Sequence, residues 1–248
     1  MLLTLDIGNT NIKSALFDDN FLIEFIIHSK VNEVIRYAKN KNLIAIAVCS
    51  VNPSVEESLA NELSEKNIEL FRANIKNKFN LRVKYETPDT LGMDRVCSTV
   101  GAYDIAVNKK LLLKSQFLLT IDFGTATTIN IVSPEAIFLG GLIAPGIKTM
   151  LKSLNEKTAQ LPLPEPVTFQ ELIGDSTNSS ILSGVYNATT GMINETFNHL
   201  KKISKNVEPI IFAAGGYAKV IMPYIKHPII YEEALVLKGL KVIYDLNK

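Results

Sequence analysis

A single internal repeat constrains the fold of this 248-residue chain more than any other feature of its sequence. Residues 2–8 read Leu-Leu-Thr-Leu-Asp-Ile-Gly, and residues 118–124 read Leu-Leu-Thr-Ile-Asp-Phe-Gly, an offset of 116 residues. The aspartate and the glycine are among the identical positions, which chance similarity between apolar segments does not explain. Because the offset is close to half the chain and only one such pair occurs, the repeat indicates two related halves and excludes a solenoid.

Each copy of the repeat predicts a strand, a tight turn at the glycine and a returning strand. Segments with helical apolar spacing follow both copies, and two apolar segments between helices are typical of buried parallel strands. A capping box at residues 54–57 is predicted to open the second helix. The predicted helices are 31–41, 55–66, 94–107, 148–157, 177–202, 217–222 and 232–246, and the predicted parallel strands are 44–49 and 209–213.

The fold class predicted from this order is α/β, with mixed sheets flanked by helices and a cleft between the two halves. A polar segment, Asn108-Lys109-Lys110, marks the division. We therefore expect an N-terminal half of residues 1–114 and a C-terminal half of residues 115–248.

Charge and cysteine content exclude several classes of protein. With 26 Lys and Arg against 25 Asp and Glu, the chain lacks the net positive charge that non-specific electrostatic binding to nucleic acid requires. Its longest apolar run, Leu43 to Cys49, is too short to span a membrane. Cys49 and Cys97 are predicted to be buried free thiols, which excludes a disulfide framework. The N-terminus lacks the basic region of a signal peptide, so we expect a reducing, cytoplasmic location.

The two Asp-x-Gly turns, at Asp6 and Asp122, are candidates for a phosphate site. A buried carboxylate needs a partner such as a metal ion, and a glycine turn lets main-chain N–H groups approach a phosphate. Two such turns facing each other could hold a polyphosphate and its Mg²⁺, with Lys13 as an added positive charge. The alternative is a pair of ordinary hairpin turns with aspartate as turn former.

Residues 92–95, Gly-Met-Asp-Arg, form a third candidate element at a loop–helix junction. Arg95 could clamp a carboxylate, and Asp94 could take a proton from an alcohol. The alternative is a helix N-terminal carboxylate beside a surface arginine. The glycine-rich residues 140–149 fail the P-loop pattern because Ile147 separates Gly146 from Lys148. A glycine turn leading into a helix is expected there instead, and none of the three histidines is a predicted base.

In order along nearly the whole chain, these motifs resemble the type III pantothenate kinases, a family within the acetate kinase, sugar kinase and actin superfamily. The Asp-x-Gly pair alone indicates only the superfamily, whereas its combination with residues 92–95 and with Pro145-Gly146 is specific to the family. The segments that carry the resemblance are residues 6–13, 50–53, 92–95, 122–128, 140–146, 174–177 and 214–216.

The resemblance implies two ribonuclease H-like halves of the actin-like ATPase type and ATP-dependent phosphorylation of the primary hydroxyl of pantothenate, the first step of coenzyme A biosynthesis. It implies that Asp94 is the general base, that Asp122 binds a monovalent cation (K⁺ or NH₄⁺), that Mg²⁺ accompanies ATP and that the enzyme is a homodimer. The implied ATP-binding residues are Asp6, Ile7, Gly8, Asn9, Thr10, Asn11, Ile12, Lys13 and Thr125, and the implied pantothenate-binding residues are Tyr85, Gly92, Met93, Asp94, Arg95 and Thr177.

Two positions depart from the family pattern. Asn130 stands where an aspartate commonly follows the second turn, and Asn52 stands where a small apolar residue often precedes Pro53. Asn130 puts in doubt the strength of a cation or neighbouring contact there, not the reaction class. Two other functions stay open from the residues: a kinase of another small alcohol or sugar, and a non-catalytic nucleotide-binding regulator, which would often carry a DNA-binding module that is not visible here.

Overall fold

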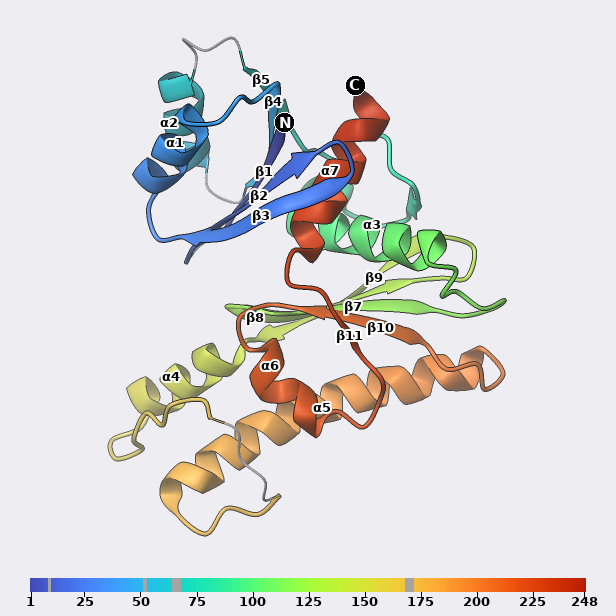
Figure 1. Cartoon of the computed structure of the whole chain (residues 1–248). Helices are drawn as coiled ribbons and strands as arrows, with labels where there is room; N and C mark the ends of the chain where they lie inside the picture. Colours follow the sequence, from blue (N-terminus) through green and yellow to red (C-terminus); the bar gives the residue numbers. More distant parts are fainter. Residues whose placement is uncertain (9, 51–52, 64–67, 168–171) are drawn as a thin grey trace. The chain divides into compact units, whose positions relative to one another are not determined.

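The computed structural model describes residues 1–8, 10–50, 53–63, 68–167 and 172–248 (Figure 1). Their contacts divide the chain into two compact units. Unit 1 comprises Met1–Leu111, Ala136–Phe138 and Ala234–Lys248. Unit 2 comprises Leu112–Glu135 and Leu139–Glu233. Asn52, which departs from the family pattern, and Asn9, which is predicted to bind ATP, lie outside the described residues.

Unit 1 is built on a mixed five-stranded sheet with the strand order β3-β2-β1-β4-β5. The first three strands form an antiparallel meander, and β4 and β5 add to it in parallel. These strands are β1 (Leu2–Ile7), β2 (Ile12–Asp18), β3 (Phe21–His28), β4 (Ala45–Ser50) and β5 (Glu69–Arg72). The unit also contains α1 (Val31–Lys39), α2 (Pro53–Leu63), β6 (Arg82–Val83), η2 (Pro88–Thr90), α3 (Met93–Asn108) and α7 (Leu235–Asn247).

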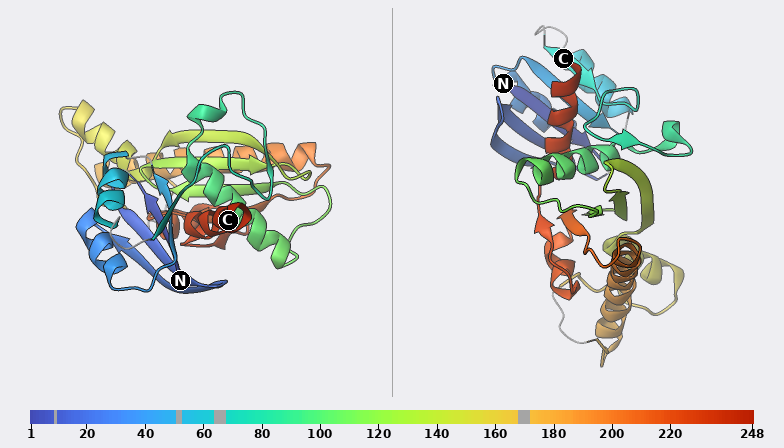
Figure 2. Two further views of the ribbon diagram at one scale, coloured as in Figure 1. Left: turned by 90° about the horizontal axis from the view of Figure 1, so that it is seen from above. Right: turned by 90° about the vertical axis from the view of Figure 1, so that its right-hand side faces the viewer.

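Helices cover both faces of this sheet (Figure 1). Alternate residues of β1, namely Leu3, Leu5 and Ile7, are buried in one apolar cluster with Val34 of α1 and Leu59 of α2. The other face packs against α3 and α7, which lie side by side in both views of Figure 2. Burial on both faces explains why β1 and β4 are almost continuously apolar.

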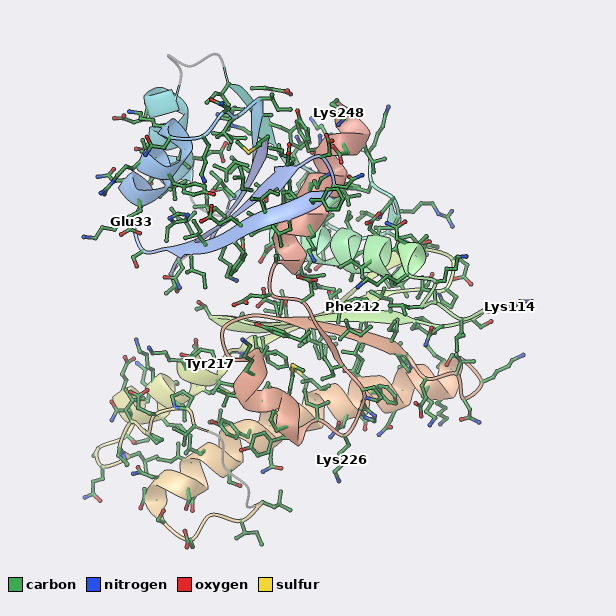
Figure 3. All side chains as sticks on the ribbon, in the orientation of Figure 1. Glu33, Lys114, Phe212, Tyr217, Lys226 and Lys248 are labelled. Carbon is green, nitrogen blue, oxygen red and sulfur yellow. The ribbon has the colours of Figure 1, made fainter. Side chains whose placement is uncertain are left out.

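Unit 2 contains the strand order β11-β10-β7-β8-β9. The long helix α5 follows one face of this sheet, and the apolar residues of β7 and β10 pack into a core with it (Figure 1). In Figure 3, Phe212 of β10 lies among packed side chains, whereas the exposed Lys226 points outward. The elements are β7 (Leu118–Phe123), β8 (Ala126–Val132), β9 (Ile137–Pro145), α4 (Ile147–Lys157), α5 (Thr177–Ile203), β10 (Ile210–Ala214), α6 (Ala218–Ile221), η3 (Met222–Tyr224) and β11 (Ile230–Tyr231).

The two copies of the sequence repeat fold in the same way. Each forms the first strand of an antiparallel hairpin, β1–β2 or β7–β8. Each first strand also has a parallel neighbour from later in its own half, β4 beside β1 and β10 beside β7. The predicted hairpins and the predicted buried parallel strands are therefore confirmed, with boundaries within two residues.

Helix α7 belongs to unit 1, although it ends the chain. Its Gly239 lies against α3 so closely that an added Cβ would be 1.7 Å from the carbonyl oxygen of Cys97. A Cβ on Gly101 of α3 would lie 2.5 Å from the carbonyl oxygen of Leu235. The two compact units therefore do not coincide with the predicted halves, residues 1–114 and 115–248. The predicted boundary between the two repeats stays a prediction, because repetition and compactness are different properties.

The predicted capping box was wrong. Helix α2 begins at Pro53, so Ser54 lies within the helix and does not cap it. Proline at a first helical position is favoured because its missing N–H has no partner there in any case. The predicted glycine turn leading into a helix is confirmed at Gly146, directly before α4, whereas Gly140 and Gly141 lie within β9, which continues to Pro145. Gly141 is needed there, because a Cβ would lie 1.8 Å from the carbonyl oxygen of Ile129.

Strands β5, β6 and β11 were missed because they have only two to four residues. Such short segments carry too little periodicity to be read from sequence. Among the described helices, none is long and apolar enough to cross a membrane.

Candidate active site

The first Asp-x-Gly turn closes the β1–β2 hairpin of unit 1. Asp6 and Lys13 are register partners, one rung before the turn, and both side chains are half-buried. The N–H of Gly8 donates to the carbonyl oxygen of Asn11 at 3.2 Å, which closes the loop. Thr10 and Asn11 are exposed at the tip. The turn therefore presents a carboxylate, an ammonium group and polar side chains at one place.

Two of the predicted ATP-binding residues of this turn are apolar and buried. Ile7 is 1% exposed and Ile12 is 6% exposed, and both belong to the core of unit 1. Any contact they make with a nucleotide is therefore through the main chain. Burying them anchors the two ends of the turn, so the loop between them is held by the core beneath it.

Two buried thiols lie beneath the site. Cys49 of β4 is the register partner of Asp6, and both Cys49 and Cys97 of α3 are free and buried, as predicted. The pKa of the Cys49 thiol is held well above its ordinary value, first by a hydrogen bond with Cys97, and then by burial and the negative charges of Asp6 and Asp94. Asp94 precedes Cys97 by three residues, about one turn of α3, and Cys97 hydrogen-bonds with Cys49, the neighbour of Asp6. Asp6 and Asp94 therefore belong to one region of unit 1.

The start of α3 positions Asp94. Gly92 is the residue before the helix, and its carbonyl oxygen accepts the N–H of Arg95 at 3.1 Å. A Cβ on Gly92 would lie 2.5 Å from the Oδ1 atom of Asp94, so the carboxylate folds back over this glycine. Met93 and Asp94 are half-buried in the first turn, where a negative charge is favoured by the helix dipole.

Arg95 is buried and not the surface arginine of the alternative interpretation. It is 6% exposed, and its Nη1 atom lies 3.5 Å from the hydroxyl oxygen of Tyr85. Its Cζ atom also lies 5.8 Å from the centroid of the Tyr85 ring. The predicted substrate-binding residues Tyr85, Gly92, Met93, Asp94 and Arg95 are thus brought together in unit 1.

The second Asp-x-Gly turn lies in unit 2, at the end of β7. Asp122 has Thr128 of β8 as one register partner and Ala214 of β10 as the other. Gly215 follows with a φ of 101°, and a Cβ there would lie 2.4 Å from the Oδ1 atom of Asp122. This close packing explains Gly215, whereas a Cβ on Gly216 would meet nothing within 4 Å.

The side chain of Thr128, opposite Asp122 on β8, lies on the same face of the sheet as the Asp122 carboxylate. The described residues contain no group of three or more His, Cys, Asp or Glu side chains that could hold a metal ion. A cation at Asp122 would therefore be held by one carboxylate with hydroxyl and main-chain carbonyl oxygens, a donor set typical of hard cations. Because Gly215 has no Cβ, its backbone lies close to that carboxylate. The residues present therefore fit such an ion.

Thr125 forms the tip of the second turn and is exposed. Its carbonyl oxygen accepts the N–H of Gly146 at 2.9 Å and the hydroxyl of Thr149 at 2.7 Å. A Cβ on Gly146 would lie 2.1 Å from the carbonyl oxygen of Gly124. The Pro145-Gly146 segment therefore fixes the backbone of this turn, which assigns a physical role to that part of the motif.

Thr177, the first residue of α5, lines a pocket of about 640 Å³ within unit 2. Ser176 caps the helix: its Oγ accepts the N–H of Ser179 at 3.3 Å, and the Oγ of Ser179 accepts the N–H of Ser176 at 2.9 Å. Asp122 and Thr125 do not line this pocket, so the predicted sites of unit 2 form two separate groups. The lining residues are Leu161, Gly174, Asp175, Ser176, Thr177, Ser180 and Ile181.

Asn130, a departure from the family pattern, is completely buried. It lies opposite Thr120 in the β7–β8 pair, and its Nδ2 atom donates to the hydroxyl of Thr120 at 3.1 Å. A neutral amide satisfies this buried position without the desolvation that a carboxylate would suffer. The substitution is therefore compatible with an intact hairpin beside Asp122.

Sequence reasoning missed Phe138. It is fully buried at the start of β9, and its ring centroid lies 5.8 Å from the Cζ atom of Arg95. Its position beside Arg95 depends on pairing between segments that are more than fifty residues apart. No local pattern around residue 138 could have indicated that contact.

Comparison with known proteins agrees with these motifs. A family model described as type III pantothenate kinase matches residues 2–199. A type III pantothenate kinase from Christiangramia forsetii is 32% identical over 252 residues, covering 100% of this chain and 99% of that protein. One from Agathobacter rectalis is 29% identical over 259 residues, covering 98% of this chain and 96% of that protein.

Solved structures agree on the fold. A Campylobacter jejuni protein assigned to the Baf family of transcriptional activators is 23% identical with a TM-score of 0.64, covering 98% of this chain and 97% of that one. An archaeal actin homologue is 10% identical with a TM-score of 0.55, covering 98% and 99%. At these identities the likeness shows the fold alone. It confirms the predicted actin-like class with mixed sheets flanked by helices.

Proposed function

The chain belongs to the type III pantothenate kinase family, and from that premise we propose which of its residues carry out the reaction. The enzyme uses ATP to phosphorylate the primary hydroxyl of pantothenate to 4′-phosphopantothenate in coenzyme A biosynthesis. The observation that carries the assignment of residues is the hydrogen bond of Cys49, the register partner of Asp6, with Cys97, which lies about one turn after Asp94 on α3. It supports a common site in unit 1 for the phosphate turn and the candidate base.

The β1–β2 turn binds the phosphates of ATP in this proposal. Phosphoryl transfer depends on positioning and on neutralising charge, and little covalent chemistry is required of the protein. The main-chain N–H groups of the turn and the ammonium group of Lys13 supply donors and positive charge. The pairing of Lys13 with Asp6 across the hairpin supports this role, because it holds the lysine side chain on the face where Asp6 lies. Asn9, Thr10 and Asn11 add polar groups, and Thr125 adds a contact from the second turn.

Asp94 acts as the general base that takes the proton from the primary hydroxyl of pantothenate. Its carboxylate folds back over Gly92 at the start of α3. This packing holds the carboxylate of Asp94 in a fixed position. Arg95, the next residue, binds the carboxylate of pantothenate through its planar donors. Tyr85, Gly92, Met93 and Thr177 complete the proposed contacts with that substrate.

Two cations complete the proposal. Mg²⁺ accompanies ATP and neutralises its phosphates, and a monovalent cation, K⁺ or NH₄⁺, is held at Asp122. The position of Thr128 opposite Asp122 and the close approach of Gly215, which has no Cβ, to the Asp122 carboxylate support the second site. Hard cations of this kind take carboxylate, hydroxyl and carbonyl oxygens as ligands.

The assembly and location of the enzyme are also proposals. We infer a homodimer and a cytoplasmic location from the family resemblance. Two free, buried cysteines support a reducing compartment, because each is kept as a thiol without a disulfide.

A coupled assay of ADP release tests the function. The purified chain is given ATP, Mg²⁺ and K⁺ with pantothenate or with a panel of sugars and small alcohols. We expect release of ADP with pantothenate and formation of phosphopantothenate, seen by mass spectrometry. Release with a sugar and not with pantothenate would favour another kinase of the superfamily, and binding of ATP without turnover would favour a regulator.

The same assay tests the monovalent cation site. Replacing K⁺ with Na⁺ or a large organic cation should lower turnover in the parental enzyme, and Asp122→Asn should reduce the dependence on K⁺. Thr158→Val is a matched control in unit 2. It removes a hydroxyl that donates a hydrogen bond to the carbonyl oxygen of Leu154 at the end of α4. K⁺ dependence that is unchanged in Asp122→Asn would contradict the assignment of Asp122.

A further inference from the structure

A buried guanidinium group needs neighbouring groups that stabilise its charge and fix its position. Arg95 is 94% buried, so its charge has lost most of its hydration. Its Cζ atom lies 5.8 Å from the ring centroid of Tyr85 and 5.8 Å from that of Phe138. Both distances are within the roughly 6 Å at which a cation is attracted to an aromatic face.

Two aromatic rings orient a guanidinium group without using its hydrogen-bond donors. A guanidinium group has five N–H donors in its plane, whereas the attraction of a ring acts on the charge as a whole. The hydrogen bond from Arg95 to the Tyr85 hydroxyl is long, 3.5 Å, and therefore weak. Neither ring contact uses an N–H donor of the guanidinium group.

A short parallel ladder brings Phe138 to Arg95. Strand β6 pairs with the first residues of β9, with Arg82 opposite Ile137 and Val83 opposite Phe138. The N–H of Lys84 donates to the carbonyl oxygen of Phe138 at 3.1 Å. Tyr85 follows directly, and its ring lies 6.1 Å from that of Phe138, centroid to centroid. The ladder therefore fixes both rings relative to each other.

The backbone of Arg95 is fixed independently. Its carbonyl oxygen accepts the hydroxyl of Thr99 at 2.6 Å and the hydroxyl of Ser98 at 3.0 Å. Both hydroxyls lie on the same helix, α3. With the backbone held by α3 and the guanidinium group beside two rings, the freedom that remains to the side chain is small, which lowers the entropy lost when a ligand binds.

We propose that Phe138 is a positioning residue for substrate binding: its ring, together with that of Tyr85, holds the guanidinium group of Arg95 ready for the substrate carboxylate. This rests on the proposed function, in which Arg95 binds the carboxylate of pantothenate. Phe138 acts only through Arg95. The Ala136–Phe138 segment, which belongs to unit 1 although its flanking residues belong to unit 2, thereby contributes to the substrate site.

Phe138→Leu tests this by removing the ring while keeping most of its volume. We expect the KM for pantothenate to rise by about three- to thirtyfold, the range that one cation–π contact supplies, with kcat and the KM for ATP much less affected. Phe138→Tyr keeps the ring, so it should retain the parental KM even where its buried hydroxyl lowers the Tm. If Phe138→Leu does not fold, as judged by circular dichroism, Phe138→Met takes its place.

A matched control separates positioning from loss of packing. Phe197→Leu removes another buried ring, on α5 in unit 2, that stacks on His227. It should lower the Tm without raising the KM for pantothenate. An equal rise in KM for Phe197→Leu and Phe138→Leu would overturn the proposal, because the effect would then follow general destabilisation.

Two further measurements distinguish failure of this proposal from failure of the proposed site. Pantothenol, in which a hydroxymethyl group replaces the carboxylate, should be used equally well by Phe138→Leu and the parental enzyme. Arg95→Lys should raise the KM for pantothenate and should abolish the additional effect of Phe138→Leu. If Arg95→Lys leaves the KM unchanged, the assignment of Arg95 fails. If Arg95→Lys raises it and Phe138→Leu does not, only the positioning role fails.

Discussion

Lys13 lies directly opposite Asp6 in the antiparallel pair of β1 and β2, one rung before the turn that closes the hairpin. Opposite residues in such a pair point to the same face of the sheet. Both side chains are half-buried, and Cys49 lies beside Asp6 on the neighbouring strand. The hairpin therefore holds a positive and a negative group side by side next to its turn.

Lys13→Met should weaken the binding of ATP. A hydrogen bond to a charged group contributes about 1.5–3 kcal/mol, so the KM for ATP should rise by about tenfold or more. The KM for pantothenate should change little. Steady-state kinetics with each substrate varied in turn measure both values. Lys39→Met, on α1 and exposed beside Glu62, is the control and should leave both parameters at parental values. A KM for ATP that Lys13→Met does not change would remove Lys13 from the ATP site.

Asp94→Asn should lower turnover while the protein stays folded. A positioned general base contributes about 10²–10⁴-fold to a rate, and the amide keeps the shape of the carboxylate without its basicity. The measurements are kcat from the coupled assay and the Tm from circular dichroism. Asp104→Asn changes a carboxyl group on the same helix, outside the site, and should keep parental turnover. Parental turnover in Asp94→Asn would exclude Asp94 as the base.

Gly215→Ala should be far more harmful than Gly216→Ala. Gly215 has a φ of 101°, and its added Cβ would lie 2.4 Å from Asp122 and 2.5 Å from the backbone nitrogen of Phe123. A non-glycine residue in strained backbone costs about 1–3 kcal/mol, and the close contacts add to it. Gly216 has open space at the same place, so its variant is the matched control. Urea unfolding compares the two. Equal stability of both variants would show that Asp122 and its neighbours can move away.

The free energy of unfolding should fall at alkaline pH, partly because of Cys49. The pKa of this thiol is raised in the folded state above its ordinary value of 9.0, chiefly by the hydrogen bond with Cys97 and by burial. Above that pH the unfolded chain has lost this proton and the folded chain has kept it, so the unfolded state binds fewer protons. The free energy of unfolding then falls as pH rises, by up to about 1.4 kcal/mol per pH unit for one group. Below the unfolded pKa the contribution is fully present.

Cys49→Ala isolates this contribution. Urea unfolding of the parental protein and the variant, followed from pH 8 to pH 10.5, should give a difference in free energy that shrinks as pH rises. Tyrosines such as Tyr186, whose pKa burial raises to about 12, contribute equally to both proteins and cancel. A difference that stays constant with pH would contradict the raised pKa of Cys49.

Much of the fold could be read from local pattern. The hairpins at the two repeats depend on apolar strands, a glycine turn and a return, all within about twenty residues, and both occur where predicted. The helices have enough residues for their periodicity to be clear, α5 above all. The three short strands and the continuation of β9 through Gly140 and Gly141 could not be read in this way, because a partner strand from elsewhere in the chain stabilises them.

The candidate site shows the same division. Asp6, Lys13, Asp94 and Arg95 were predicted from the sequence because each lies in a short motif with a physical reason for its residue types. That Arg95 is buried, and that Phe138 lies beside it, depends on the β6–β9 ladder. A surface arginine and a buried one look alike in sequence.

The repeat, the mixed α/β class and the two Asp-x-Gly hairpin turns could be predicted from the sequence, since these follow from residues close together in the chain. The packing of α7 on α3 through Gly101 and Gly239, and the place of residues 136–138 in unit 1, could be seen only in the folded chain. Both depend on contacts between residues more than fifty positions apart. The free energy of such contacts comes from the surfaces that meet, and neither segment carries that information alone.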